Sequence, residues 1–162
     1  MKNLLLILTI LISSVVYGQP KSTDTMFVEN VDTSFIEKEI FRVINEYRVS
    51  KGVDVLEWDT AYSNGARKHS EWLSETGLFV HDEKSLTNEC IVGTNDGNNL
   101  FTYGKFADIV VTRWKNSPGH NYVMLLPRPN YGGVGISFNE GVYVGNAITT
   151  FRSSEYHKKI IF

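Results

Sequence analysis

The feature that most constrains the fold is the order of helix-like and strand-like apolar patterns along the chain. Apolar residues recur at helical spacing in segments between residues 34 and 124, whereas the stretch that ends the apolar pattern, "YGGVGISFNEGVYVGNAITTF" (131–151), alternates as strands do. In that stretch Val134, Ile136 and Phe138 would form one strand, Val142 and Val144 another, with "NEG" as the turn. Helices first and antiparallel strands last are typical of the α+β class, in which helices pack on a sheet.

Three long helices and one short helix are predicted. The first covers residues 34–52, where Ser34 and Glu37 match a capping box and Gly52 is a suitable terminator. The second covers residues 60–77, with Asp59 as its N-cap. The third covers residues 106–116, and a short strand is expected near residues 89–92.

The segment "SPGHNYVMLL" (117–126) predicts the short helix. Ser117 can be its N-cap, and Pro118 fits the first helical position, where a missing N–H costs nothing. His120 then falls at the third helical position, close to the positive end of the helix dipole, which disfavours a protonated imidazole. A neutral ring at this place suits a ligand, and the alternative is a structural histidine that bonds a loop carbonyl.

The first 18 residues have the pattern of a secretory signal peptide. Lys2 precedes an apolar run from Leu4 to Tyr17, and Val16 and Gly18 are the small residues before a cleavage site. The run is shorter than the roughly 20 residues that cross a bilayer, and no second apolar run follows. We therefore expect cleavage between Gly18 and Gln19, a secreted or periplasmic protein, and no membrane span afterwards.

The charge and the cysteine content limit the classes of partner and the disulfide chemistry that the chain can have. The formal net charge is −2, and the loss of Lys2 with the signal peptide makes it one unit more negative. Nucleic acid requires clustered Lys and Arg, so a nucleic-acid partner is not expected. Cys90 is the only cysteine, which excludes an intramolecular disulfide. It is interpreted as a small buried hydrophobe or, alternatively, as a reactive or intermolecular thiol.

The chain length suits one domain. The predicted organisation is a signal peptide over residues 1–18, an N-terminal lead-in over 19–32, one domain over 33–152 and a C-terminal tail over 153–162. The lead-in is polar without a sustained period, so we expect either a flexible segment or a strand along the domain edge.

Several segments in this order resemble the CAP superfamily, also called the SCP or cysteine-rich secretory/antigen 5/pathogenesis-related domain, in its compact bacterial form. The segments that carry the resemblance are "INEYRVSKGVDVLEWD" (44–59), "ARKHSEWLSETGLFVHD" (66–82), "NEC" (88–90), "RWKNSPGH" (113–120) and "YGGVGISFNEGVYVGNAIT" (131–149). The resemblance implies a three-layer α-β-α sandwich, with a small three-stranded antiparallel sheet between helical layers.

The resemblance also implies a cleft lined by two histidines and acidic residues. These are His81 of "FVHD", His120 of "SPGH" and Glu89 of "NEC". Larger members of the family carry a second glutamate where this chain has Ser117. We expect Ser117 and Tyr122 to line the cleft, although tyrosines of this kind are often core-margin residues.

Two imidazoles and a carboxylate suit Zn²⁺ or a similar divalent metal. The spacing of the three residues is not by itself a metal motif, and the sequence contains no HExxH, CxxC or GxSxG pattern. His69 shares a helix face with Tyr62 and Leu73, so we expect it to be a satisfied histidine at the core margin.

The resemblance favours an exported, non-enzymatic module that binds a small apolar ligand, a glycan or a protein partner, with zinc or another divalent cation held by His81, Glu89 and His120 and no organic cofactor. The alternative is a peptidase-like hydrolase in which the metal, or His81 and Glu89, activates water with the help of His120. A third reading makes Ser117 a nucleophile, and its expected capping role argues against this.

Overall fold

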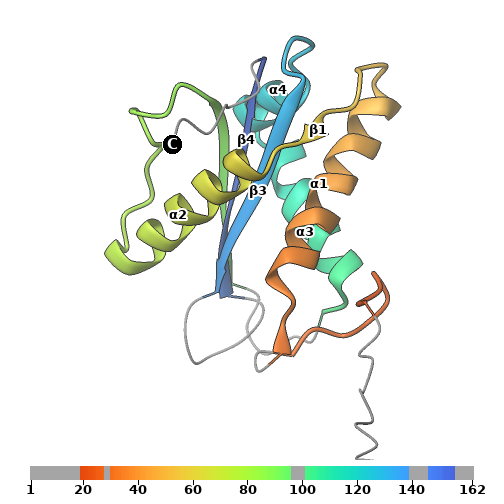
Figure 1. Ribbon diagram of the computed structural model, residues 1–162, viewed down its shortest axis with the longest axis vertical. Helices are drawn as coiled ribbons and strands as arrows, with labels where there is room; N and C mark the ends of the chain where they lie inside the picture. The colour runs from red at the N-terminus through yellow and green to blue at the C-terminus, as the bar shows by residue number, and fades with distance from the viewer. Residues whose placement is uncertain (1–18, 28–29, 96–100, 139–145, 156–162) are drawn as a thin grey trace, which may run out of the picture.

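The computed structural model describes residues 19–27, 30–95, 101–138 and 146–155. The predicted signal peptide and tail lie outside these residues, apart from the first three residues of the tail, and so do the "NEG" turn, Val142 and Val144. Figure 1 shows the elements, which are α1 (Thr33–Ser50), β1 (Glu57–Trp58), α2 (Thr60–Thr76), β2 (Asn88–Asn95), α3 (Tyr103–Lys115), α4 (Pro118–Met124), β3 (Tyr131–Phe138) and β4 (Asn146–Ser154).

The described strands form one sheet in the order β1-β3-β4-β2. β4 pairs antiparallel with β2 on one side and with β3 on the other, which gives the three antiparallel strands that the resemblance implies. The expectation of three strands alone is wrong, because β1 adds a two-residue parallel pair at the edge. Glu57 N donates to Asn130 O at 2.7 Å and Asp59 N donates to Gly132 O at 2.8 Å, so the exit from α1 is fixed to β3.

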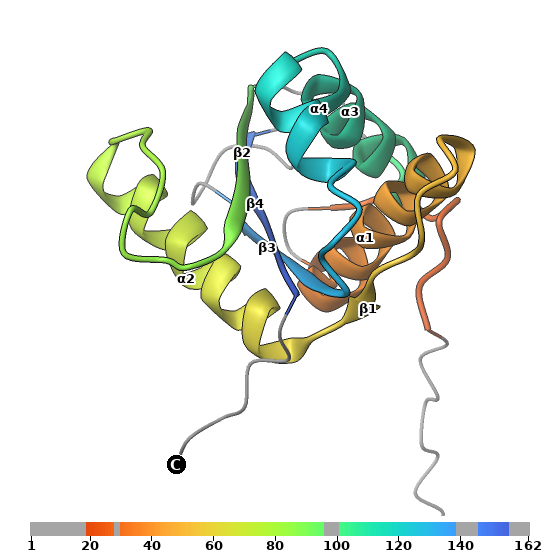
Figure 2. The same cartoon turned by 90° about the horizontal axis from the view of Figure 1, so that it is seen from above.

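Helices cover both faces of the sheet. α2 contacts β3 and β4, while α1 contacts β3 and both α3 and α4 contact β2. Figure 2 shows α2 on one side of the strands and the other three helices on the opposite side. The predicted α+β class and the three-layer α-β-α sandwich are therefore confirmed. None of the described helices is long and apolar enough to span a membrane.

The main core lies between the sheet, α1 and α3. Residues three or four positions apart on each helix turn the same face inward, as the apolar spacing predicts. The fully buried side chains there include Ile36, Ile40, Ile44, Phe106, Val110, Trp114, Val134 and Phe151. Cys90 is also fully buried in this cluster, which agrees with its interpretation as a small hydrophobe.

The start of α1 differs from the prediction. Asp32 is the N-cap, and its side chain accepts from Phe35 N at 2.9 Å. The predicted capping box of Ser34 and Glu37 is wrong because the Glu37 carboxylate is used elsewhere. It is 1% exposed, forms an ion pair with Arg67 of α2, and accepts from Ile136 N of β3 at 3.1 Å.

The other predicted helix ends are closer to the structure. Asp59 caps α2 by accepting from Ala61 N at 2.7 Å, and Gly77 ends the helix at φ 68°, a left-handed conformation that favours glycine. α3 begins three residues before the predicted position 106, because Thr102 accepts from Lys105 N at 3.2 Å as the N-cap.

Two glycines of β3 allow α2 to lie against the sheet. A Cβ atom on Gly133 would lie 2.3 Å from Ser63 N, and one on Gly135 would lie 1.9 Å from Arg67 N. Ser63 Oγ uses the close approach to donate to Val134 O at 2.8 Å. The "YGGVG" segment therefore sets the distance between the sheet and the helix that carries His69.

The lead-in is packed on the domain where it is described. Met26 is fully buried, and its N–H donates to Phe101 O at 2.8 Å. Thr25 forms an isolated antiparallel bridge with Thr102. The described residues of the segment make only this single strand-like bridge and form a turn at residues 22–23, so they do not make the strand that was one of the two expectations.

Candidate functional site

A histidine and a buried glutamate meet where the segment of residues 77–87, here called the α2–β2 loop, enters β2. The side chain of Glu89 is 6% exposed, and its Oε1 lies 3.0 Å from Nδ1 of His81. Asp82 N donates to the same oxygen at 3.1 Å. Because an ionised carboxylate only accepts hydrogen bonds, Nδ1 of His81 carries the proton, and Nε2 of a neutral ring keeps its lone pair.

Arg152 of β4 holds the other side of this carboxylate. Arg152 and Glu89 are direct partners in the β2–β4 register, and Nε of Arg152 donates to Oε2 of Glu89 at 3.0 Å. Nη2 donates to Oδ2 of Asp82 at 2.8 Å. Although burial acts to raise the pKa of Asp82, the bond and the charge of Arg152 outweigh it and the pKa is lowered.

Arg152 and Asp82 were not among the residues that the sequence singled out. Arg152 is 5% exposed and lies in β4, one residue beyond the stretch 131–151 whose pattern predicts strands. A charged residue directly after such a stretch is a weak signal, because buried charges are normally paired. Its partner, however, follows only from the pairing of β2 with β4.

His120 lies beside His81 at the start of α4. The centroids of the two rings are 5.9 Å apart and their planes make an angle of 65°. His120 is half-buried, at the predicted third position of the helix. The pKa of His120 is lowered, mainly by burial and also by the neighbouring His81, so its ring is held neutral. The predicted direction is correct, and burial is its largest cause.

Ser117 and Tyr122 lie on the same short helix. Ser117 is the N-cap by position, but its side chain makes no capping hydrogen bond, contrary to the expectation that this oxygen is engaged. Tyr122 is 68% exposed. The structure therefore brings His81, Glu89 and His120 together, whereas the assignment of Ser117 and Tyr122 to the cleft lining stays a prediction.

The donor atoms at this place fit two imidazole ligands better than a three-residue set. Both oxygens of Glu89 accept hydrogen bonds from protein groups. Within the described part of the chain, no group of three or more His, Cys, Asp and Glu side chains is placed to hold a metal ion. A cation bound to His81 and His120 would thus take its remaining ligands from water or from a bound molecule.

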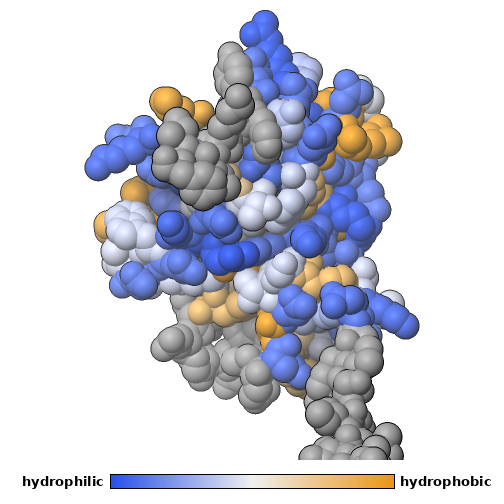
Figure 3. Space-filling view, viewed as in Figure 1, coloured by the Kyte–Doolittle hydropathy of each residue, from blue (hydrophilic) through white to orange (hydrophobic). Residues whose placement is uncertain are grey.

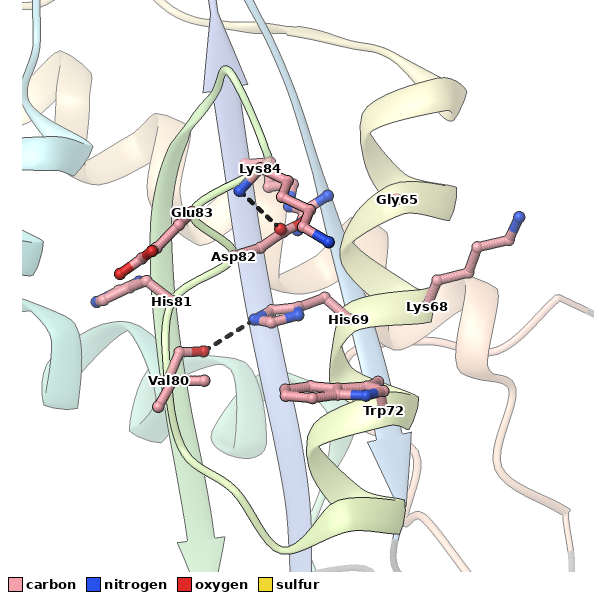
Figure 4. Close-up of a pocket in the computed structure, with 10 residues that line it drawn as sticks. Gly65, Lys68, His69, Trp72, Val80, His81, Asp82, Glu83 and Lys84 are labelled. Atoms are coloured by element: carbon pink, nitrogen blue, oxygen red, sulfur yellow. Dashed lines mark hydrogen bonds and ion pairs between the residues drawn. The ribbon is translucent and has the colours of Figure 1, made fainter.

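A pocket of about 750 Å³ opens between α2 and the α2–β2 loop, next to the glutamate. Figure 4 shows its wall, where the rings of His69 and Trp72 are stacked on α2 and the loop lies opposite. His69 is 8% exposed, as expected at the core margin, and its Nε2 donates to Val80 O at 3.1 Å. The residues that line the pocket are Gly65, Lys68, His69, Trp72, Val80, His81, Asp82, Glu83, Lys84 and Arg152.

Comparisons with known proteins agree with this architecture. The profile of the cysteine-rich secretory protein (CAP) family matches residues 41–151. Two proteins of Bacillus subtilis are similar in sequence. One is the uncharacterized membrane protein YlbC, 29% identical over 80% of this chain, and the other is the uncharacterized protein YkwD, 25% identical over 74%. The matched regions are only 39% and 49% of these longer relatives.

Two solved structures share the fold. An outer surface protein from Borrelia burgdorferi superimposes with a TM-score of 0.61 at 17% identity, covering 78% of this chain and 97% of the other. An extracellular protein with an SCP domain from Bacillus anthracis gives a TM-score of 0.55 at 20% identity, covering 75% and 41%. With the family profile matching more than half of its residues, this chain belongs to the CAP family.

Proposed function

We propose that the chain is an exported binding module without a reaction of its own, and that His81 and His120 hold a divalent cation such as Zn²⁺. The observation that carries the proposal is the full engagement of Glu89. One of its oxygens accepts from His81 and from Asp82 N, and the other accepts from Arg152. A carboxylate held in this way orients a neighbouring group and has little freedom to act on a substrate.

Glu89 would then support the metal indirectly. A carboxylate that accepts from one ring nitrogen of histidine fixes the tautomer and raises the basicity of the other nitrogen. His81 meets this condition, since its Nδ1 is bound to Glu89 and its side chain is 54% exposed. His120 would supply the second imidazole, which burial holds neutral. When bound, the cation would offer open positions to an oxygen or nitrogen atom of a ligand.

The contacts support the hydrolase less well. A general base needs a free lone pair within hydrogen-bond reach of the water that it activates. Glu89 has one oxygen shared by two donors and the other paired with an arginine. For Ser117, the capping bond that argued against a nucleophile is absent, but no hydrogen bond between described residues joins its hydroxyl to His120. Glu89 therefore lacks the free oxygen of a general base, and Ser117 lacks the hydrogen bond to a base that would activate it as a nucleophile.

Export is supported by the signal-peptide pattern of residues 1–18. The two structural neighbours are named as an outer surface protein and an extracellular protein, and this chain shares their fold. If export follows this route, the mass of the exported protein will correspond to a chain that begins at Gln19.

Zinc titration by calorimetry tests the metal. We expect His81→Ala and His120→Ala each to weaken zinc binding at least about 100-fold, and Glu89→Gln to weaken it about 10–100-fold, as is typical for outer-shell partners. Glu75→Gln, at an exposed acid near the end of α2, is the matched control and should leave the affinity unchanged. Equal zinc affinity in the wild type and both histidine variants would refute the metal site.

The same variants separate binding from catalysis. A panel of peptide and ester substrates should show no turnover above the buffer rate. Turnover that is lost in Glu89→Gln, with the fold intact by circular dichroism, would instead establish the hydrolase.

A further inference from the structure

The pocket between α2 and the α2–β2 loop is lined mainly by residues outside the metal pair, and His81 is the residue that the two places share. Its volume of about 750 Å³ lies within the range of small-molecule sites, roughly 300–1,000 Å³. Figure 4 shows His69 and Asp82 between the helix and the loop, while the ring of His81, which also belongs to the lining, points to the other side of the loop. The buried carboxylate of Glu89 bonds His81 of the metal pair through one oxygen and Arg152 of the pocket lining through the other.

A donor of a largely buried arginine faces this pocket. Nε and Nη2 of Arg152 are used by Glu89 and Asp82, whereas Nη1 donates to no other described residue. Arg152 is 5% exposed as a residue, but Nη1 is not among the described side-chain atoms that are both fully buried and unpaired, so this nitrogen is open to the pocket. Gly65 gives access to this nitrogen, since a Cβ atom at position 65 would lie 3.1 Å from Nη1. A glycine inside a helix lowers helix stability. The space that Nη1 of Arg152 needs explains why α2 has a glycine at this position.

An aromatic wall stands beside this donor. The rings of His69 and Trp72 are stacked, with centroids 5.8 Å apart and planes within 11° of parallel. Trp72 is nonetheless 40% exposed, and Val80 on the opposite wall is 49% exposed. In Figure 3 the hydrophobic groups at the left edge, over α2 and the loop, are separated by hydrophilic ones, so this face is not one continuous apolar patch. The wall therefore suits a ligand with one small apolar face and not a large apolar surface.

The charges of the lining nearly cancel. Three cations, Lys68, Lys84 and Arg152, are opposed by Asp82 and Glu83 in the lining, and Glu89 lies directly against Arg152. A polyanion would meet three carboxylates here and a cation would meet three basic groups. The lining alone carries one net positive charge, and Glu89 behind Arg152 brings the sum of these groups to zero. Many donors and acceptors with little net charge favour a neutral ligand rich in hydroxyl groups.

We propose that this pocket binds a neutral glycan, with one sugar ring packed on Trp72 and a hydroxyl oxygen accepting from Nη1 of Arg152. Sugars combine an apolar face of C–H groups with hydroxyls around the ring edge, which matches the wall and the donor. The inference rests on the proposed binding role of the chain and is independent of the metal.

Calorimetric titration with two neutral trisaccharides, of N-acetylglucosamine and of glucose, tests the proposal, with a galacturonic acid trisaccharide as the anionic probe. We expect a neutral probe to bind and the anionic probe to bind at least tenfold more weakly. Trp72→Ala and Gly65→Ala should each weaken the neutral probe at least tenfold. Gly65→Ala is favourable for the helix but brings a Cβ atom 3.1 Å from Nη1 of Arg152, so circular dichroism must show an intact fold before lost binding is counted.

The controls are Phe27→Ala and Gly119→Ala. Phe27 is 45% exposed and does not line the pocket, and a Cβ atom at position 119 would meet nothing within 4 Å. Both should bind the neutral probe like the wild type. Failure of both neutral probes to bind, preference for the anionic one, or full binding by Gly65→Ala would overturn the glycan site. Zinc affinity measured on the same variants should not change, so failure of the glycan site is distinguishable from failure of the metal.

Discussion

Replacing Gly135 with alanine tests how closely α2 lies against the sheet. The new Cβ would lie 1.9 Å from Arg67 N and 2.4 Å from the carbonyl carbon of Ala66. Ordinary contact begins at 3.4 Å, so helix and strand must separate by about 1.5 Å. Because the clashing atoms are backbone, no side chain can rotate away, and the cost should reach the upper end of overpacking, about 3 kcal/mol.

The separation also stretches hydrogen bonds between α2 and β3. Ser63 Oγ donates to Val134 O at 2.8 Å and Ser70 Oγ donates to Gly135 O at 3.0 Å, and each such bond contributes about 1 kcal/mol. We therefore expect Gly135→Ala to lower the free energy of unfolding by about 3–5 kcal/mol.

Urea denaturation followed by tryptophan fluorescence measures this change, with Gly119→Ala as the control. Position 119 is helical and unobstructed, so the control should differ from the wild type by no more than about 1 kcal/mol. A loss below about 1 kcal/mol in Gly135→Ala, with an unchanged denaturant slope, would refute the close approach of α2 and β3.

Two further predictions concern single side chains. Burial raises the pKa of the Cys90 thiol, so Ellman's reagent should react with the folded protein at least about 100-fold more slowly than with the unfolded chain, and equal rates would contradict its burial. The bond from Arg42 is the main reason that the pKa of Glu39 lies below its ordinary value of 4.5, and Ser22 also donates to this carboxylate. A lowered pKa in the folded state adds stability that is complete above pH 4.5 and is lost as the pH falls through the folded value, so Glu39→Gln should flatten the acid limb of the stability profile in urea titrations between about pH 5 and 2.

The helices were predictable because their signals are local. Apolar spacing on α1 and the caps at Asp59 and Gly77 depend only on neighbouring residues, and they appear in the structure as expected. The prediction of a capping box at Ser34 was wrong because Glu37 binds Arg67, thirty residues away, and no local pattern indicates such a partner. β1 was missed for a similar reason, since two residues become a strand only through their pairing with β3.

The candidate site was predictable only in part. The resemblance indicated His81, Glu89 and His120, and the structure brings these residues together. Arg152 and Asp82 could not be predicted as site residues, because their contacts with Glu89 and with each other depend on strand register and on the course of a loop. His69 was expected only at the core margin, yet the same burial places its ring in the wall of a pocket.

The Arg152–Glu89 pair limits which variants can separate the two proposed sites. Arg152 joins β4 to the α2–β2 loop by binding Glu89 and Asp82, so its removal would leave two carboxylates near one another without their common cation. Breaking a buried pair on one side is strongly destabilising, so an Arg152 variant would disturb the metal pair, the pocket and the fold together. Gly65 lines the pocket beside Arg152, whereas His120 lies beside His81 and does not line the pocket. Substitutions at those two positions, measured against zinc and against a neutral trisaccharide, are therefore the pair of variants that assigns each ligand to its own site.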